Sequence, residues 1–186
     1  MNDRFHFVKK WNEPEEQPQT TRGKGWEWKI AHIKKPSRIF MGSMTDLFGD
    51  WVSKEFITEM LYTCGLYPEH RFLFLTKNPE RYKDFTFPKN CWKGMTVDHN
   101  IKQEYWKGID FISIEPFRQQ VVFYPVRWII CGGMTPKPCH KNVWVDDLIV
   151  NAHSKNIPVF LKKNLKYDKP LIQEYPKELQ LGEVEQ

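Results

Sequence analysis

The sequence predicts an α/β protein, a partial or open TIM-like (β/α)6 barrel with a parallel sheet. Six short apolar runs alternate with helical or short connecting segments, which is the pattern of a parallel sheet built from crossovers. Each run ends in a polar residue or a glycine, as strands do at the edge of a barrel that carries its site. From Ser43 to Lys162 the run ends are about 24 residues apart, fewer than the roughly 31 of a complete eight-unit barrel.

The six predicted strands share an apolar interior and a polar carboxyl end. They are 38–41, 71–77, 91–97, 111–114, 127–133 and 157–161. The fourth organises the others, because its apolar run passes directly into a carboxylate, Glu115. Pro116 cannot donate to a sheet ladder, so the strand is expected to end at this point.

Three helices are predicted from the spacing of apolar residues, at 26–33, 53–64 and 143–154. Ser53 is a suitable N-cap for the second helix. The third helix has four residues on its predicted inward face, namely Trp144, Leu148, Ile149 and Ala152. Residues 117–125 lack helical spacing, and a turn with a β-bridge is expected there.

The composition indicates a packed globular protein. The 186 residues are 40% hydrophobic and 15% aromatic, which argues against a disordered chain. The formal charge of +5 allows an anionic ligand or nucleic acid without requiring either. We expect residues 1–25 to form a flexible or accessory segment and residues 26–186 to form the barrel domain with a basic C-terminal tail. The absence of a signal peptide and of an 18-residue apolar stretch predicts a cytoplasmic protein that is not in a membrane.

Glu115 is the first candidate for a catalytic residue, because a carboxylate at the end of an apolar strand is partly desolvated and needs a cation nearby. Lys77 and Lys162 end two other strands, and either lysine is a candidate partner. The pair is either a general base or ligand-anchoring acid beside a lysine, or an ion pair that holds the rim together. Gly132 and Gly133 either admit a ligand close to the backbone or supply a positive φ.

The cysteines predict neither a disulfide framework nor a metal site. Cys64, Cys91, Cys131 and Cys139 are widely spaced and include no Cys-x-x-Cys pair. Cys139 precedes His140, but no second pair of ligands lies near them in the sequence.

Five blocks, taken in order, resemble one known family. They are Gly42-Ser-Met-Thr-Asp-Leu-Phe-Gly-Asp-Trp51, Phe74-Leu-Thr-Lys-Asn-Pro-Glu-Arg-Tyr82, Trp92-Lys-Gly-Met-Thr-Val-Asp98, Phe111-Ile-Ser-Ile-Glu-Pro116 and Trp128-Ile-Ile-Cys-Gly-Gly133. The resemblance covers roughly residues 34–180. It is to a phage-associated family of unassigned function, whose fold resembles the partial barrel of radical S-adenosylmethionine enzymes.

This resemblance implies a cavity at the strand tips that takes S-adenosylmethionine or a substrate. Beside Glu115, the residues implied to line it are Ser43, Thr76, Thr96, Asp98, Gly132 and Gly133. Full-length relatives begin with a three-cysteine motif, similar to the site that holds a [4Fe–4S] cluster. This chain has no cysteine before Cys64, so no cluster is expected from this chain alone. The cysteine segment would also supply the first barrel strand, for which residues 5–10 offer a substitute.

The resemblance therefore implies a barrel protein in the cytoplasm of a bacterial host, inactive alone or dependent on a partner that supplies the cluster. An alternative is a phage-encoded nucleic-acid-binding module without catalysis, based on Lys9-Lys10, Lys34-Lys35 and the basic tail. A further alternative is an enzyme that uses Glu115 and a lysine in acid–base chemistry. A protein partner or a homodimer is expected at an exposed sheet edge.

Overall fold

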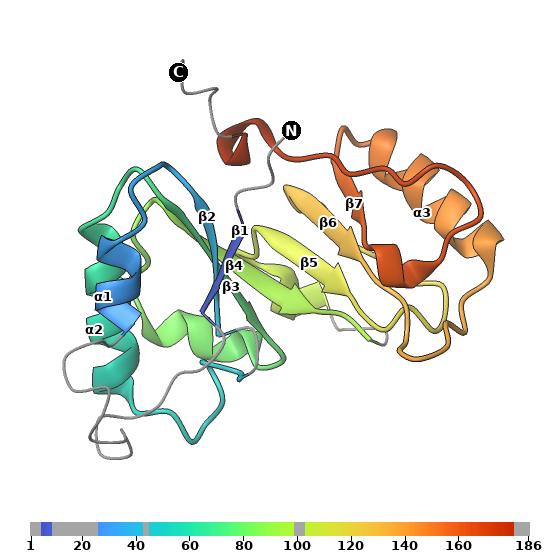
Figure 1. Cartoon of the computed structure of the whole chain (residues 1–186). Helices are drawn as coiled ribbons and strands as arrows, with labels where there is room; N and C mark the ends of the chain where they lie inside the picture. Colours follow the sequence, from blue (N-terminus) through green and yellow to red (C-terminus); the bar gives the residue numbers. More distant parts are fainter. Residues whose placement is uncertain (1–4, 9–25, 43–44, 99–102, 181–186) are drawn as a thin grey trace. The chain divides into compact units, whose positions relative to one another are not determined.

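The computed structural model describes residues 5–8, 26–42, 45–98 and 103–180 (Figure 1). The chain divides into two compact units. The first comprises Met1–Thr76, Arg81–Trp92 and Leu181–Gln186, and the second comprises Lys77–Glu80 and Lys93–Gln180.

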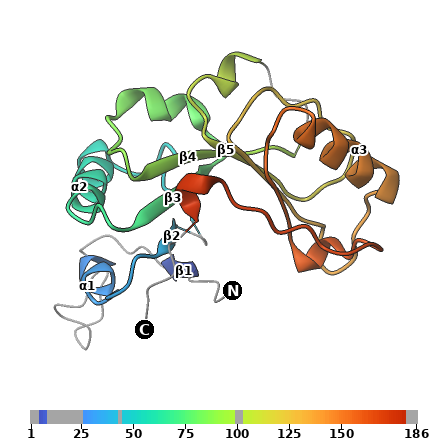
Figure 2. The same cartoon turned by 90° about the horizontal axis from the view of Figure 1, so that it is seen from above.

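The first unit contains parallel strands that pair in chain order. Its elements are β1 (Phe5–Val8), α1 (Trp26–Ala31), β2 (Arg38–Met41), α2 (Lys54–Gly65) and β3 (Arg71–Thr76). Phe5 is in register with Arg38, which is in register with Arg71. Helices α1 and α2 lie on the same side of β2 and β3 (Figures 1 and 2), as right-handed crossovers of one sheet require.

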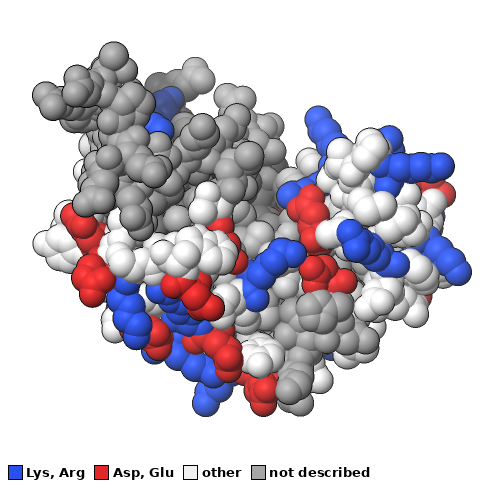
Figure 3. Space-filling model, turned by 90° about the horizontal axis from the view of Figure 1, so that it is seen from below, with Lys and Arg blue, Asp and Glu red and all other residues white. Residues whose placement is uncertain are grey.

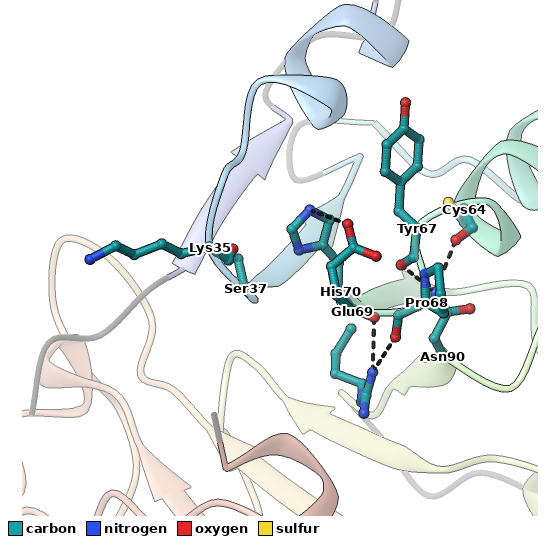
Figure 4. A network of polar contacts seen from close by, with 9 residues as sticks. Lys35, Ser37, Cys64, Tyr67, Pro68, Glu69, His70 and Asn90 are labelled. Atoms are coloured by element: carbon teal, nitrogen blue, oxygen red, sulfur yellow. Dashed lines mark hydrogen bonds and ion pairs between the residues drawn. The ribbon is translucent and has the colours of Figure 1, made fainter. Parts of the chain in front are cut away.

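Helix α2 begins and packs as its sequence predicts. The Ser53 side chain accepts a hydrogen bond from the backbone amide of Phe56 at 3.3 Å, which satisfies a donor of the first turn. Its buried residues are Ile57, Met60, Leu61 and Cys64. At the other end, the Asn90 side chain donates to the carbonyls of Cys64 and Tyr67, both at 2.9 Å (Figure 4). The amide therefore fixes the turn that leads from α2 toward β3.

The second unit contains the remaining strands, again parallel and in chain order. They are β4 (Cys91–Thr96), which enters this unit at Lys93, then β5 (Phe111–Ile114), β6 (Trp128–Cys131) and β7 (Val159–Leu161). A 3₁₀ helix, Gln103–Trp106, connects β4 to β5, and α3 (Asn142–His153) connects β6 to β7. All four residues of β5 and of β6 are buried, as expected of interior strands in a parallel sheet.

The α/β class and the parallel strands in chain order, the arrangement of a partial TIM-like barrel, are confirmed. Two details of the prediction are wrong. No β-bridge forms at 117–125, and the isolated bridge among the described residues joins Phe160 to Gln173. The buried residues of α3 are Val145, Leu148 and Ala152, whereas Trp144 and Ile149 are only half-buried.

Strand β1 adds a seventh strand to the six predicted from the apolar runs. It pairs with β2 from Phe5 to Val8, the place for which residues 5–10 were a predicted substitute. The other residues of the expected accessory segment, up to residue 25, lie outside the described part of the chain. Among the residues that are described, no helix is long and apolar enough to span a bilayer.

Candidate functional site

The carboxyl ends of β5, β6 and β7 bring four of the predicted residues together. Glu115 follows β5 and Lys162 follows β7, while β6 lies between these strands and ends before Gly132 and Gly133. Across the two glycines, the Lys162 ammonium donates to the Glu115 carboxylate. The side chains of Lys162 and Glu115 are 43% and 28% exposed. The ion pair is therefore open to a ligand from solvent.

Asn164 is a third member of this site, and it was not predicted from the sequence. Its side-chain amide donates to Glu115 Oε1 at 3.1 Å and to the carbonyl oxygen of Gly133 at 2.9 Å. Its own Oδ1 is buried and accepts no hydrogen bond within the described residues. Asn164 follows two lysines just past the strand, a context that resembles an ordinary solvated turn.

The glycines are explained by close packing rather than by backbone conformation. A Cβ atom at Gly132 would lie 2.7 Å from Glu115 Oε1 and 3.1 Å from Lys162 Cδ. A Cβ atom at Gly133 would lie 2.6 Å from the backbone oxygen of Asn164. Among the described glycines, positive φ occurs at Gly42 and Gly108 instead. Of the two predicted roles, positive φ is therefore wrong, and the groups that approach the backbone closely belong to the protein itself.

Backbone hydrogen bonds hold the three strand tips in place. The amide of Gly132 donates to the carbonyl of Ile114 at 3.0 Å, and the amide of Phe117 donates back to Gly132 at 2.9 Å. The amide of Lys162 donates to the carbonyl of Cys131 at 2.8 Å. The sheet ladder thus continues up to the ion pair, so the backbone under Glu115 and Lys162 is fixed while their side chains reach outward.

Lys77 has a different partner from Lys162. Its ammonium contacts Asp98 at 3.0 Å, so of the two lysines proposed to pair with Glu115, the structure selects Lys162. The Lys77 side chain is 68% exposed, which makes its pair with Asp98 a surface contact that contributes little to stability. Thr96 lies at the end of β4, in the same unit.

Thr76 belongs to the first unit and bonds within it. Its hydroxyl donates to Asp46 Oδ1 at 2.7 Å, and the same oxygen accepts the amide of Phe48 at 3.0 Å. Ser43 lies outside the described residues. The second unit therefore gathers Glu115, Lys162 and the glycines, and it holds Lys77 with Asp98 as a separate pair.

Three of the four cysteines are buried, and Cys139 is exposed. Cys64, Cys91 and Cys131 are buried; burial raises the pKa of the Cys64 thiol, with a further contribution from Cys91. Burial also raises the pKa of Cys131, with a further contribution from Glu115. No group of three or more His, Cys, Asp or Glu residues that could hold a metal ion occurs in the described part of the chain.

Charges of both signs occur on the face drawn in Figure 3, where acidic side chains lie among the basic ones. The nucleic-acid alternative stays a prediction.

Comparison with curated proteins and with solved structures found no match. Residues 1–181 match a family described as "Protein of unknown function (DUF5131)". This match spans nearly the whole chain, including the strand tips described above. A family without an assigned function is what the ordered sequence blocks predicted, and the chain belongs to the DUF5131 family.

Proposed function

We propose that the protein is a radical-S-adenosylmethionine-like barrel that binds a small zwitterionic ligand at the strand tips of its second unit. The observation that carries the proposal is the half-exposed pair of Glu115 and Lys162 above Gly132 and Gly133. An adjacent carboxylate and ammonium match the ammonium and carboxylate of an amino-acid group. S-adenosylmethionine carries such a group, and it is the first ligand to test.

A zwitterion binds here by exchanging partners with the internal ion pair. The ligand's ammonium donates to Glu115 in place of Lys162, and the released Lys162 donates to the ligand's carboxylate. Because both side chains are partly solvated, breaking their mutual contact costs less than about 1 kcal/mol. The ligand forms two charge-assisted hydrogen bonds where the chain had one, so the exchange favours binding.

Asn164 keeps Glu115 in place during this exchange. Its amide bonds both Glu115 and the carbonyl of Gly133, so the carboxylate stays anchored to the β6 tip when Lys162 turns to the ligand. Asn164 is thus a positioning residue in this proposal, while Glu115 and Lys162 contact the ligand.

Calorimetric titration with S-adenosylmethionine, S-adenosylhomocysteine and methionine tests the proposal. Glu115→Gln and Lys162→Gln each remove one charge, and we expect each to weaken binding about tenfold or more. Lys163→Gln is the matched control, because Lys163 is exposed, lies next to Lys162 and is not part of the site. The proposal is wrong if none of the three ligands saturates the wild-type protein, or if Lys163→Gln weakens binding as much as Lys162→Gln does.

A further inference from the structure

A pocket of about 350 Å³ lies beside α3 in the second unit. One side is formed by α3, through Trp144 and neighbouring positions, and the other by the segment that connects β5 to β6, through Phe117, Val122 and Phe123. This connection contains no helix, whereas a crossover helix normally covers the flank of the next helix in a barrel. Without such a helix, a pocket remains open beside α3, and most of the side chains that line it are apolar.

The walls of the pocket are suited to a planar ring. Phe117 and Trp144 contact one another with ring centroids 6.3 Å apart, and Phe123 lies on the same lining. Aromatic side chains bind other rings face-offset or edge-on. Val122, which also lines the pocket, is 69% exposed, so the pocket opens to solvent on that side.

The two charged residues of the pocket, Lys155 and Asp147, lie at different positions in its lining. The Lys155 ammonium lies 5.2 Å from the centroid of the Phe123 ring and donates to Asn151 Oδ1 at 2.7 Å. It lies just beyond the end of α3. Asp147, within α3, accepts a hydrogen bond from Gln120 at 2.8 Å. An anionic ligand is therefore attracted to the Lys155 end and repelled from the Asp147 end.

We propose that this pocket binds a small aromatic anion, with its ring between Phe123 and Trp144 and its anionic group at Lys155. The volume lies at the lower end of the range for small-molecule sites, which are mostly apolar with a few placed polar groups. The pocket is distinct from the strand-tip site, because none of its lining residues is Glu115, Lys162 or Asn164. The proposal therefore does not depend on the ligand proposed for that site.

Fluorescence titration with anilinonaphthalene sulfonate, an aromatic anion, tests this site in the full chain. The chain offers a matched pair of substitutions, since Val122 in the pocket and Val150 on α3 outside its lining are 69% and 70% exposed. We expect Val122→Glu to weaken binding at least tenfold, because it places a charge against the ring and repels the anion. Val150→Glu adds the same charge and should leave binding unchanged.

Lys155→Gln distinguishes the contribution of the Lys155 charge to binding from that of the aromatic contacts. We expect it to weaken binding of the sulfonate probe roughly threefold, as for an exposed ion pair. Binding of the neutral probe N-phenylnaphthylamine should be unaffected. Near-ultraviolet circular dichroism confirms that each variant is folded before titration. Equal weakening by Val122→Glu and Val150→Glu, or no saturable fluorescence with the folded wild type, would overturn the proposal. Glu115→Gln should change the binding of neither probe, which keeps this test separate from the titration of the strand-tip site.

Discussion

Strand β5 carries a carboxylate at each end, Asp110 just before it and Glu115 just after it. The two side chains are similarly shielded, at 21% and 28% exposed. Each is paired with a cation from a neighbouring segment, Arg127 for Asp110 and Lys162 for Glu115. The difference lies in what else each carboxylate bonds.

At the amino end the contacts form a closed structural cluster. Asp110 accepts the backbone amide of Lys93 at 2.8 Å and the Arg127 guanidinium at 3.1 Å. The second arm of that guanidinium donates to Glu178 at 2.8 Å. Asp110 holds a backbone amide of β4 as well as the arginine, so this carboxylate cannot change partners without disturbing the sheet.

At the carboxyl end, by contrast, the partners of Glu115 among the described residues are side chains, those of Lys162 and Asn164. Lysine carries three rotatable donors on a flexible stem, so this contact can reorganise around a ligand while the backbone stays fixed. The comparison teaches that the same pairing of acid and base stabilises one edge of the unit and forms a candidate site at the other. This is the division of roles found in TIM barrels.

The largest effect is expected from Gly133→Ala, which tests how far the carboxyl edge can adjust. The added methyl meets backbone atoms of Asn164 and Leu165 at 2.6 and 3.0 Å, so we expect the free energy of unfolding to fall by about 1–3 kcal/mol. Gly132→Ala is the control, since the three atoms nearest to its methyl belong to the side chains of Glu115 and Lys162 rather than to the backbone. Urea denaturation measures both. Equal losses would show that the tip is rigid throughout.

Asp110→Asn tests whether the amino edge is the structural one. Removing the charge weakens the bonds from Lys93 and Arg127, and we expect a loss of about 1–2 kcal/mol in the free energy of unfolding. The matched substitution Glu115→Gln should cost less than about 1 kcal/mol. Thermal and urea unfolding of the two variants under the same conditions provides the measurement. A larger loss for Glu115→Gln would reverse the assignment of the two edges.

Asn164→Ala sharpens the description of the carboxyl edge. It deletes the bonds to Glu115 and to the carbonyl of Gly133, which predicts a loss of about 1 kcal/mol. It should also weaken binding of the zwitterionic ligand at the strand tips, because the Glu115 carboxylate is no longer anchored. Lys163→Ala, in the same 3₁₀ turn, provides the control in urea denaturation. If both variants unfold at the same urea concentration, Asn164 does not anchor the site.

The smallest effect is expected at Glu178, the outer residue of the amino-edge cluster formed by Asp110, Arg127 and Glu178, and it depends on pH. A hydrogen bond from its own backbone amide and the Arg127 guanidinium lower the pKa of Glu178 below its ordinary value of 4.5. The stabilisation is therefore present above about pH 4.5 and is lost as the pH falls through the lower, folded-state pKa. We expect Glu178→Gln to cost about 0.5 kcal/mol or less at neutral pH, and the difference from wild type to vanish in acid. Unfolding curves measured from pH 3 to pH 7 would show this convergence, and a constant difference would contradict it.

Much of the carboxyl edge was predictable because its signals are local. Glu115, Lys162 and the two glycines directly follow apolar runs, and parallel strands place such residues at one edge. The choice between Lys77 and Lys162 was not local, since it depends on which strand tip lies across β6 from Glu115. The amide of Asn164 depends on the same long-range contact.

The amino-edge cluster was missed, although part of its signal was available. Asp110 and Arg127 each stand immediately before a strand, and the register pairs Phe111 with Trp128, so opposite charges flank two adjacent strands at equivalent positions. Glu178 gave no such signal, because it lies far along the chain in a short 3₁₀ helix. The inward face of α3 was misassigned at Trp144 and Ile149, since a helix that is apolar around most of its circumference does not indicate which stripe is buried.

The pairing of strands in chain order has a consequence for how each unit folds. Register partners are between 17 and 33 positions apart, as in Gly94 with Phe111 and Phe5 with Arg38. The entropy lost in closing loops of this size grows only with the logarithm of their length. In each of these pairs a strand bonds the one that precedes it in the chain, so no pairing step has to close a longer loop. The Glu115–Lys162 contact needs β5, β6 and β7 side by side, so we expect it to form only once β7 has joined the sheet.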